Sequence, residues 1–210
     1  MASAVDICNL ALTYLGDEAT ITNLDPPEGS AQADHCARFF PHALKYMLEQ
    51  RPWSFATRRI ALAELETDKC GWAHAYAYPG DCVRVVSVTD PDDKYYEFPA
   101  DFIVEAHPAL EGSRVIRTDA CNAVCRYVHD CANFDSFSEA FGQALAYYLA
   151  HLLAGPIESG STGMKASTEL LKMHQITLMQ AMQLDAQQSR HAYDAKANWS
   201  NRYYRGARHG

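Results

Sequence analysis

The 210-residue chain has no long apolar run. No stretch approaches the roughly 18 to 20 consecutive apolar residues that a helix needs to cross a bilayer, so no membrane association is expected. The N-terminus also lacks the basic-then-apolar pattern of a signal peptide, because Asp6 and Asn9 interrupt it early. We therefore expect a protein that is made and kept in a reducing cytosol.

Disulfide bonds are not expected either. The seven cysteines are an odd number, scattered through a mid-sized chain, and this favours free thiols. Hydrophobic residues make up 48% of the chain and charged residues 21%, which is ordinary for a globular protein. A chain of this length supports one core, or one core with a subordinate layer, without a metal or a crosslink.

Basic residues are scarce except at the C-terminal end. The formal net charge is −8, yet residues 195–210 contain four basic residues and no acid. Residues 1–194 therefore hold 14 basic and 26 acidic residues, a balance of −12. An acidic body with a basic tail is a charge arrangement that a function has to explain.

Apolar residues recur with helical spacing in four segments, at about residues 3–15, 30–50, 136–154 and 164–195. Pro41 should kink or restart the second helix, and a capping box formed by Ser136 and Glu139 should open the third. Gly155 and Pro156 should end the third helix, with a loop following over 157–163.

The middle of the chain changes to strand composition. A small antiparallel sheet is expected from about residue 74 to 129, with candidate strands at 82–88, 95–98, 102–104, 115–116 and 123–128. The predicted fold class is α+β and predominantly helical: a helical bundle from the N- and C-terminal segments with a small central antiparallel β-rich insertion. Residues 1–70 are predicted to be the N-terminal bundle helices and residues 71–132 the β-rich insertion. Residues 133–196 are predicted to be the C-terminal bundle helices and residues 197–210 an extended arm.

An aromatic anchor follows the second predicted helix. Pro52 ends that helix, and Trp53 and Phe55 follow two positions apart. We predict that both aromatic side chains are core residues packed between the helical layer and the sheet. Arg58 and Arg59 after the anchor either pair with acids of a neighbouring subunit or partner, or lie in a solvated turn.

The C-terminal tail combines aromatic residues with arginines, the composition of interface hot spots. Such a tail suits an arm that folds into a partner's groove. Single-stranded nucleic acid as the ligand and a frayed, functionless terminus are the alternatives. The candidate partner-binding residues are Trp199, Arg202, Tyr203, Tyr204, Arg205 and Arg208.

Four residues near the end of the predicted sheet invite a zinc interpretation: Cys121, Cys125, Cys131 and His129. Their spacing does not follow the usual paired ligand pattern, so a buried thiol is the better interpretation of Cys125. An acidic turn resembles a cation loop but lacks the glycine and the distant glutamate of an EF-hand. That turn contains Asp90, Asp92 and Asp93.

Histidines beside a cysteine suggest nucleophilic catalysis at one place in the second helix. His35, Cys36 and His42 lie within two turns of each other, although on an amphipathic helix such residues usually occupy the polar boundary. His174 in the last helix is interpreted as half-buried or facing another subunit. No residue is given a catalytic, cofactor-binding or metal-binding role, and no enzyme activity is predicted.

The order of these segments resembles the tail tubular protein A family, the head-to-tail adaptor proteins of short-tailed bacteriophages. The resemblance covers most of residues 5–190 and depends on the order and spacing of several pieces together. They are residues 7–16 with Ile21 and Leu24, 52–56 with Leu62, 76–85, and 134–150 leading to Leu153 and Ala154.

The resemblance implies a structural virion protein at the head-tail junction, made in the host bacterial cytoplasm. It implies a dodecameric ring beneath the portal protein that extends the DNA channel and presents its lower surface to the tail nozzle or tail tube protein. The C-terminal arm would dock onto the portal. The acidic body suits a conduit that genomic DNA passes without specific binding, although many cytosolic proteins are equally acidic.

Three other functions stay open. A head-completion connector of a long-tailed phage uses a similar helical adaptor. A tail-associated hydrolase of cell-surface polysaccharide would need convergent carboxylates, typically about 5 to 10 Å apart. A nucleic-acid-binding protein would retain DNA in a salt-dependent manner, and the acidic body argues against it.

Overall fold

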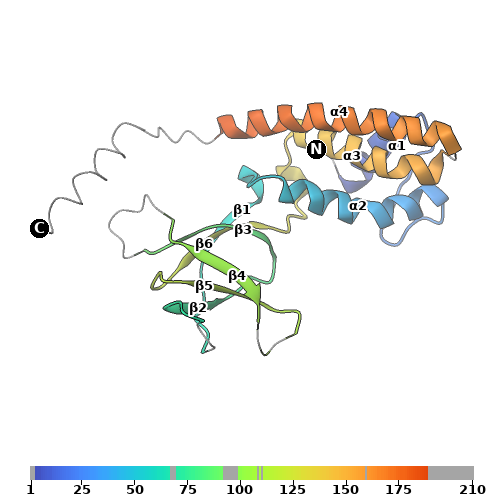
Figure 1. The fold of residues 1–210 in the computed structure, drawn as a ribbon. Coiled ribbons are helices and arrows are strands. Elements are labelled where there is room, and N and C mark those ends of the chain that lie inside the picture. The colour runs from blue at the N-terminus through green and yellow to red at the C-terminus, as the bar shows by residue number, and fades with distance from the viewer. Residues whose placement is uncertain are drawn as a thin grey trace, which may run out of the picture.

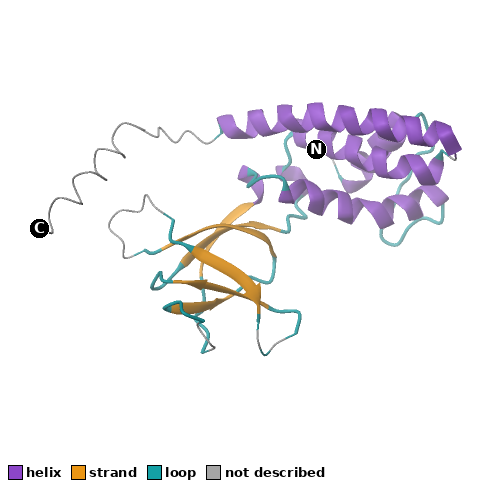
Figure 2. Cartoon of the chain, in the orientation of Figure 1, coloured by secondary structure: helices purple, strands orange, loops and turns teal. Residues whose placement is uncertain are grey.

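A computed structural model of the chain describes residues 3–66, 70–91, 99–107, 109, 111–158 and 160–188. Within these residues the fold is mixed α+β, with four α-helices and two small three-stranded antiparallel sheets. The helices lie side by side in Figure 1, and the sheets lie beneath one end of them. Figure 2 shows that helix and strand occupy separate parts of the molecule.

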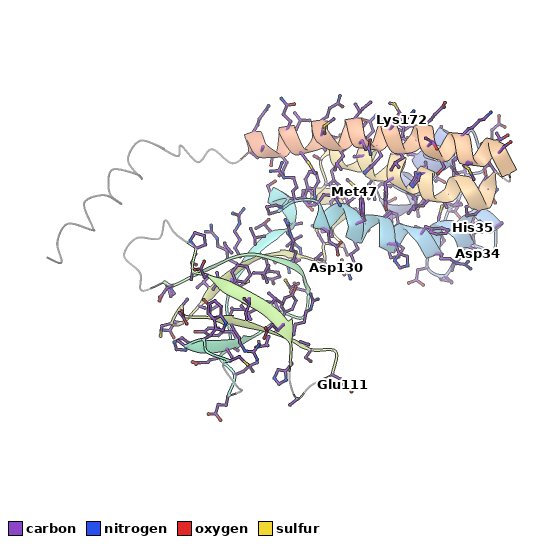
Figure 3. The ribbon with its side chains drawn as sticks, in the orientation of Figure 1. Asp34, His35, Met47, Glu111, Asp130 and Lys172 are labelled. Atoms are coloured by element: carbon purple, nitrogen blue, oxygen red, sulfur yellow. The ribbon has the colours of Figure 1, made fainter. Side chains whose placement is uncertain are left out.

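The helices come from both ends of the chain and share one apolar core. α1 spans Ala4–Leu15, α2 spans Ala31–Glu49, α3 spans Glu139–Ile157 and α4 spans Gly160–Gln187. α3 packs against the other three helices, which explains why so many of its residues are buried. Met47 of α2, labelled in Figure 3, is fully buried in this core. None of the described helices is long and apolar enough to cross a lipid bilayer.

Serine side chains cap the N-termini of three helices. Ser3 and Asp6 form a capping box at the start of α1, and Ser30 caps α2. The box predicted between Ser136 and Glu139 is wrong, because Ser138 caps α3 instead and accepts the N–H of Phe141 at 3.2 Å. The Ser136 hydroxyl donates to the carbonyl of Asn133 at 2.7 Å and so is engaged before the helix begins.

Pro41 does not restart the second helix, which is one of the two effects predicted for it. α2 continues through Pro41 although this residue removes one backbone hydrogen bond from the helix interior. Phe40, Ala43 and Leu44 around it are all buried in the helical core. Their packing outweighs the unfavourable propensity of one proline.

The connection between α3 and α4 is much shorter than predicted. α3 continues through Pro156 to Ile157 and α4 already begins at Gly160, so the expected loop over 157–163 is wrong. A Cβ atom at Gly163 would lie only 1.9 Å from the backbone oxygen of Glu158. This glycine is therefore required by the close approach of the two helices rather than by a loop. Residues 189–195, predicted to continue the last helix, lie outside the described residues.

The first sheet follows directly on the helices and has the order β1–β6–β3. β1 spans Thr57–Ala61, β3 spans Cys82–Thr89 and β6 spans Val124–His129. β6 is the central strand and pairs antiparallel with both neighbours. Val128 of β6 is buried in the helical core, so one end of this sheet is attached to the helices.

The second sheet has the order β2–β5–β4. β2 spans His74–Ala77, β4 spans Phe102–Ala106 and β5 spans Arg114–Thr118. All its strand pairs are antiparallel. β5 is the central strand and four of its five residues are buried.

Isolated bridges join the two sheets at both edges. One bridge links Glu64 to Tyr76, and the other links Val88 to Ala100, where the Ala100 N–H donates to the Val88 carbonyl at 2.8 Å. These bridges pair backbone groups that an open sheet edge would leave exposed. A second core lies between the sheets, formed by Tyr76, Cys82, Val88, Ile116, Ala120, Ala123, Cys125 and Tyr127.

The sequence predicted one sheet over 74–129, and two sheets are found. β1 lies before the predicted range and was not predicted as a strand, because its two arginines resemble a solvated turn. Individual strand positions were easier to predict: the segments at 82–88, 102–104, 115–116 and 123–128 fall largely in β3, β4, β5 and β6. The predicted strand at 95–98 lies outside the described residues.

Replacing Trp53 by alanine should destabilise the fold. Trp53 is fully buried, and truncating a large buried aromatic typically costs about 3 to 5 kcal/mol. Urea unfolding followed by circular dichroism measures the free energy of unfolding, with Trp72→Ala as the control because Trp72 is only half-buried. An unchanged unfolding midpoint for Trp53→Ala would contradict a core position.

Candidate functional site: the anchor and the end of α4

The aromatic anchor closes the C-terminal end of α2. Trp53 lies just before the short 3-10 helix η1 (Ser54–Ala56), which leads into β1. Its indole N–H donates to the carbonyl of Met47 at 2.7 Å. The last carbonyls of a helix have no partner within the helix, so this bond satisfies one of them. Pro52 is half-buried beside Trp53.

Both anchor aromatics pack against the start of α3. The rings of Trp53 and Phe141 meet edge to face with centroids 4.9 Å apart, and the rings of Phe55 and Phe141 do the same at 4.9 Å. The ring of Phe137 lies 5.0 Å from that of Phe55. Trp53 belongs to the helical core and Phe55 packs against it, at the point where the chain turns from helix to sheet.

The anchor also binds the last turns of α4. The Arg51 guanidinium lies 3.3 Å from the Asp185 carboxylate, and Ser54 donates to this carboxylate through its backbone N–H at 3.0 Å and its hydroxyl at 2.7 Å. Arg51 also donates to the backbone carbonyl of Met182, and its guanidinium lies 5.6 Å from the centre of the Trp53 ring. A cation is favourable at this position, because carbonyl groups give a helix C-terminus a partial negative charge.

This cluster of Arg51, Ser54 and Asp185 was not predicted from the sequence. The signal was present, because Asp185 follows His174, Leu178 and Ala181 at the spacing of the buried face of α4. An acid on the buried face of a helix requires a partner, since a buried unpaired charge is very costly.

The predicted partner-binding residues of the tail lie outside the described residues. These residues are Trp199, Arg202, Tyr203, Tyr204, Arg205 and Arg208. The described chain ends at Gln188, directly after the turn that Asp185 attaches to the anchor. The anchor therefore fixes the position of the last described turn of α4.

Arg58 and Arg59 do not lie in a turn, so that alternative is wrong. Both belong to β1, where Arg58 forms a salt bridge of 3.2 Å with Asp81 of the same chain. Arg59 lies directly opposite Arg126 of β6. The two adjacent arginines therefore have different surroundings.

The residues considered for zinc are not brought together. Cys125 is buried between the two sheets, whereas Cys131 is buried in the helical core and Cys121 is exposed. His129 lies 2.8 Å from the carbonyl of Ala56 through its Nδ1 atom. Among the described residues no group of three potential metal ligands converges. Of the acidic turn, Asp92 and Asp93 lie outside the described residues.

Cys36 faces another thiol rather than a catalytic base. Its side chain hydrogen-bonds to that of Cys8 in the helical core, which together with burial raises the pKa of Cys8 above its ordinary value. His35 is half-buried and His42 is exposed. The arrangement is that of two packed thiols between α1 and α2.

His174 is fully buried, so its predicted half-buried or subunit-facing position is wrong. Its Nδ1 atom donates to the carbonyl of Ala144 at 2.9 Å, and its ring lies 4.9 Å from that of Tyr148 and 6.1 Å from that of Tyr46. Within the described part of the chain its Nε2 atom has no hydrogen-bond partner. Burial, together with the nearby His151, lowers the pKa of His174 below its ordinary value of 6.5.

Large hydrophobic side chains are exposed along α4. These residues, which we call the outer apolar stripe, are spread around the solvent-facing half of α4 among polar side chains: Met164, Met173, Ile176, Met179 and Leu184. Met179 is 64% exposed and Leu184 51%. The opposite side of α4 packs on α3. Lys172, labelled in Figure 3, lies on the outer side of the same helix.

A groove of about 420 Å³ lies where α1 and α3 begin. Its apolar lining comes from residues such as Ile7, Leu10 and Phe137, and acidic residues surround it. We call it the acidic groove, after Asp6, Asp135 and Glu139. Hydrogen bonds from Ser3 lower the pKa of Asp6, so that this carboxyl stays ionised.

A scan of the chain against protein-family models finds no match, and a search of curated proteins finds none either. The surfaces and contacts of the chain itself are therefore the basis for assigning a function. Three features qualify: the anchored end of α4, the outer apolar stripe and the charged surfaces.

Replacing Asp185 by alanine should release the last turns of α4. The expected loss is about 1.5 to 3 kcal/mol, because hydrogen bonds to a charged group are removed and Arg51 loses its partner. Urea unfolding measures the loss, and hydrogen exchange of the amides near residue 185 measures the release. Glu169→Ala is the matched control, since Glu169 is an exposed acid on the same helix. Equal effects of the two substitutions would contradict the role of the anchor.

Stability should fall as the pH drops through the range in which His174 titrates. The folded-state pKa lies below 6.5, so the contribution of this residue is fully present above pH 6.5 and is lost as the pH falls through the lowered pKa. The slope from one proton is at most about 1.4 kcal/mol per pH unit. Melting temperatures of the wild type and His174→Asn, measured from pH 8 to pH 5, should converge at the acidic end. His42→Asn, at an exposed position of α2, is the control for replacing a histidine by asparagine.

Proposed function

We propose that the chain is a structural virion protein, a head-to-tail adaptor that forms a ring beneath the portal, extends the DNA channel and attaches the tail nozzle. The observation that carries this proposal is the outer apolar stripe of α4. In this assignment the chain acts by assembly, and its surfaces are binding surfaces for other copies and for virion proteins.

The stripe supports assembly because it has no partner among the described residues. Of the large hydrophobic side chains that are exposed in the described part of the chain, most lie on α4. Covering apolar surface contributes roughly 25 cal/mol per Å², so a partner on this helix would gain free energy from burying the stripe. In the proposed ring that partner is the neighbouring copy, and a helical bundle from both chain ends forms the ring wall.

The anchored end of α4 supports a docking role for the C-terminal arm. Arg51 and Ser54 hold Asp185 in place, twelve residues before the start of the arm proposed at 197–210. A fixed exit point presents every arm of a ring in the same direction. Its Trp, Tyr and Arg residues are the types that dominate binding at protein interfaces. Repeated sites around a ring give strong attachment even when each arm binds modestly.

The acidic body suits the proposed DNA channel. A balance of −12 over residues 1–194 repels phosphates, and a conduit that DNA slides through must not retain it. The β-rich part and its loops would then face the lower tail components.

Deleting residues 199–210 should leave the fold intact and abolish portal binding. The deletion removes all six candidate docking residues of the arm and no residue that the structure describes. Circular dichroism melting checks the fold, and co-sedimentation with portal rings of the virus that encodes the chain checks binding. Electron microscopy of the mixture shows whether rings attach.

A finer comparison keeps the length of the arm. Trp199→Ala, Tyr203→Ala and Tyr204→Ala together should weaken portal binding strongly, because they remove the aromatic anchors. Asn198→Ala, Ser200→Ala and Asn201→Ala together are the matched control and should bind normally. Normal portal binding by the protein that lacks residues 199–210 would defeat the docking proposal.

A further inference from the structure

The strands of the first sheet carry positive charge only. β1 contains Arg58 and Arg59, β3 contains Arg84 and β6 contains Arg126, and none of the three strands contains an acid. In a chain with an acidic body this is an unusual local excess. Arg58 is neutralised by Asp81 of the same chain.

The other arginines lie on one face of the sheet, which we call the arginine face. Arg59 is directly opposite Arg126, and on the other side of β6 Ser87 is the partner of Arg126. Paired residues of neighbouring strands point to the same side. The adjacent residues Cys125 and Tyr127 point to the opposite side, into the core between the sheets. Arg59 and Arg126 therefore project from the outer surface.

Arg84 joins the same face nearer the helices. It is paired with Val128, which is buried in the helical core, and is itself exposed. Within the part of the chain that the structure describes, Arg59, Arg84 and Arg126 form no salt bridge. Like charges directly opposite each other on a sheet are destabilising. The chain keeps this unfavourable arrangement, which points to an anionic partner.

A matching surface exists on the same chain. Residues 130–158 contain four acids and neither lysine nor arginine: Asp130, Asp135, Glu139 and Glu158. Asp135 and Glu139 flank the acidic groove, are exposed and form no salt bridge within the described residues. Asp130, labelled in Figure 3, lies between β6 and this helical segment.

We propose that the arginine face of one copy binds the acidic groove of the next copy of this chain. Guanidinium groups match carboxylates in planar, two-pronged hydrogen bonds, and their alkyl stems can cover the apolar lining of the groove. The two surfaces are different patches, so the contact is heterologous and can repeat from copy to copy until a ring closes. The inference rests on the proposed ring and names the residues that set its register.

This partner explains the arginines better than DNA does. The acidic groove contributes carboxylates together with apolar surface, which suits three arginines with long alkyl stems. An arginine face that is covered by the next copy cannot bind DNA phosphates, so the DNA channel would not retain DNA. Retention of DNA that depends on Arg59 and Arg126 would overturn the proposal.

A charge-swap experiment tests the contact. One variant carries Arg59→Glu and Arg126→Glu, and the other carries Asp135→Arg and Glu139→Arg. Each alone should lose assembly in mass photometry and light scattering, because like charges then meet at every contact. The mixture should assemble, since the reversed sheet of one variant matches the reversed groove of the other while the two native surfaces also match.

Two controls separate this contact from general effects. Arg38→Glu with Lys45→Glu makes the same change in net charge at exposed positions of α2, and should assemble like the wild type. Melting temperatures check that the variants fold. If the change at Glu139 weakens the start of α3, Asp135→Arg alone replaces the double variant of the groove. The reversed sheet should melt at about the same temperature as the wild type, because an opposed pair of glutamates replaces the opposed pair of arginines.

The outcomes distinguish this contact from the ring itself. If the wild type assembles and each reversed variant alone assembles equally well, the proposed contact is overturned but the proposed ring is not. Folded variants that lose assembly but fail to recover it when mixed would also overturn the contact. Wild type that stays monomeric, alone and with portal, would overturn the ring and the contact together.

Discussion

The salt bridge between Arg51 and Asp185 joins the segment between α2 and β1 to the last turn of α4, which is far away in sequence. Arg51 follows α2, Ser54 opens the path into β1, and Asp185 lies in the last turn of α4. Trp53 lies between these groups and donates to the end of α2. The start of β1 and the end of α4 are therefore both attached to the same point of the helical core. A loss of this joint would release the end of α4 and lower stability.

Elements with a strong local signal were predictable, and those that depend on distant partners were not. The helices have clear apolar periodicity, so all four were located from the sequence, although their ends shifted. The loop predicted before α4 failed because Gly163 serves a close approach between helices, which composition cannot distinguish from a turn. The restart of the helix predicted as one possibility at Pro41 is wrong, because the packing of its buried neighbours outweighs the propensity of a single proline. One sheet became two because strand grouping depends on long-range pairing and not on strand composition.

The candidate surfaces were predictable to different degrees for the same reason. The aromatic anchor stands out in the sequence, and its burial follows from residue type. Its contact with Asp185 crosses most of the chain, yet an acid on the buried face of α4 was a usable sign. The arginine face had no such sign, because Arg59 and Arg126 become neighbours only when the register of β1 and β6 is known. The grouping of charges on a sheet therefore cannot be predicted from sequence spacing alone, whereas the grouping of residues on one face of a helix can.

The proposed assembly divides its work between the two kinds of structure. Apolar burial along α4 is not directional, so it can supply affinity without fixing how neighbours align. Charge pairing between the arginine face and the acidic groove is directional, and it supplies register and rejects wrong alignments. The DNA channel adds a constraint on orientation, since exposed arginines along it would retain phosphates. A ring built from this chain must then turn the arginine face toward a neighbour and leave acidic surface toward the channel.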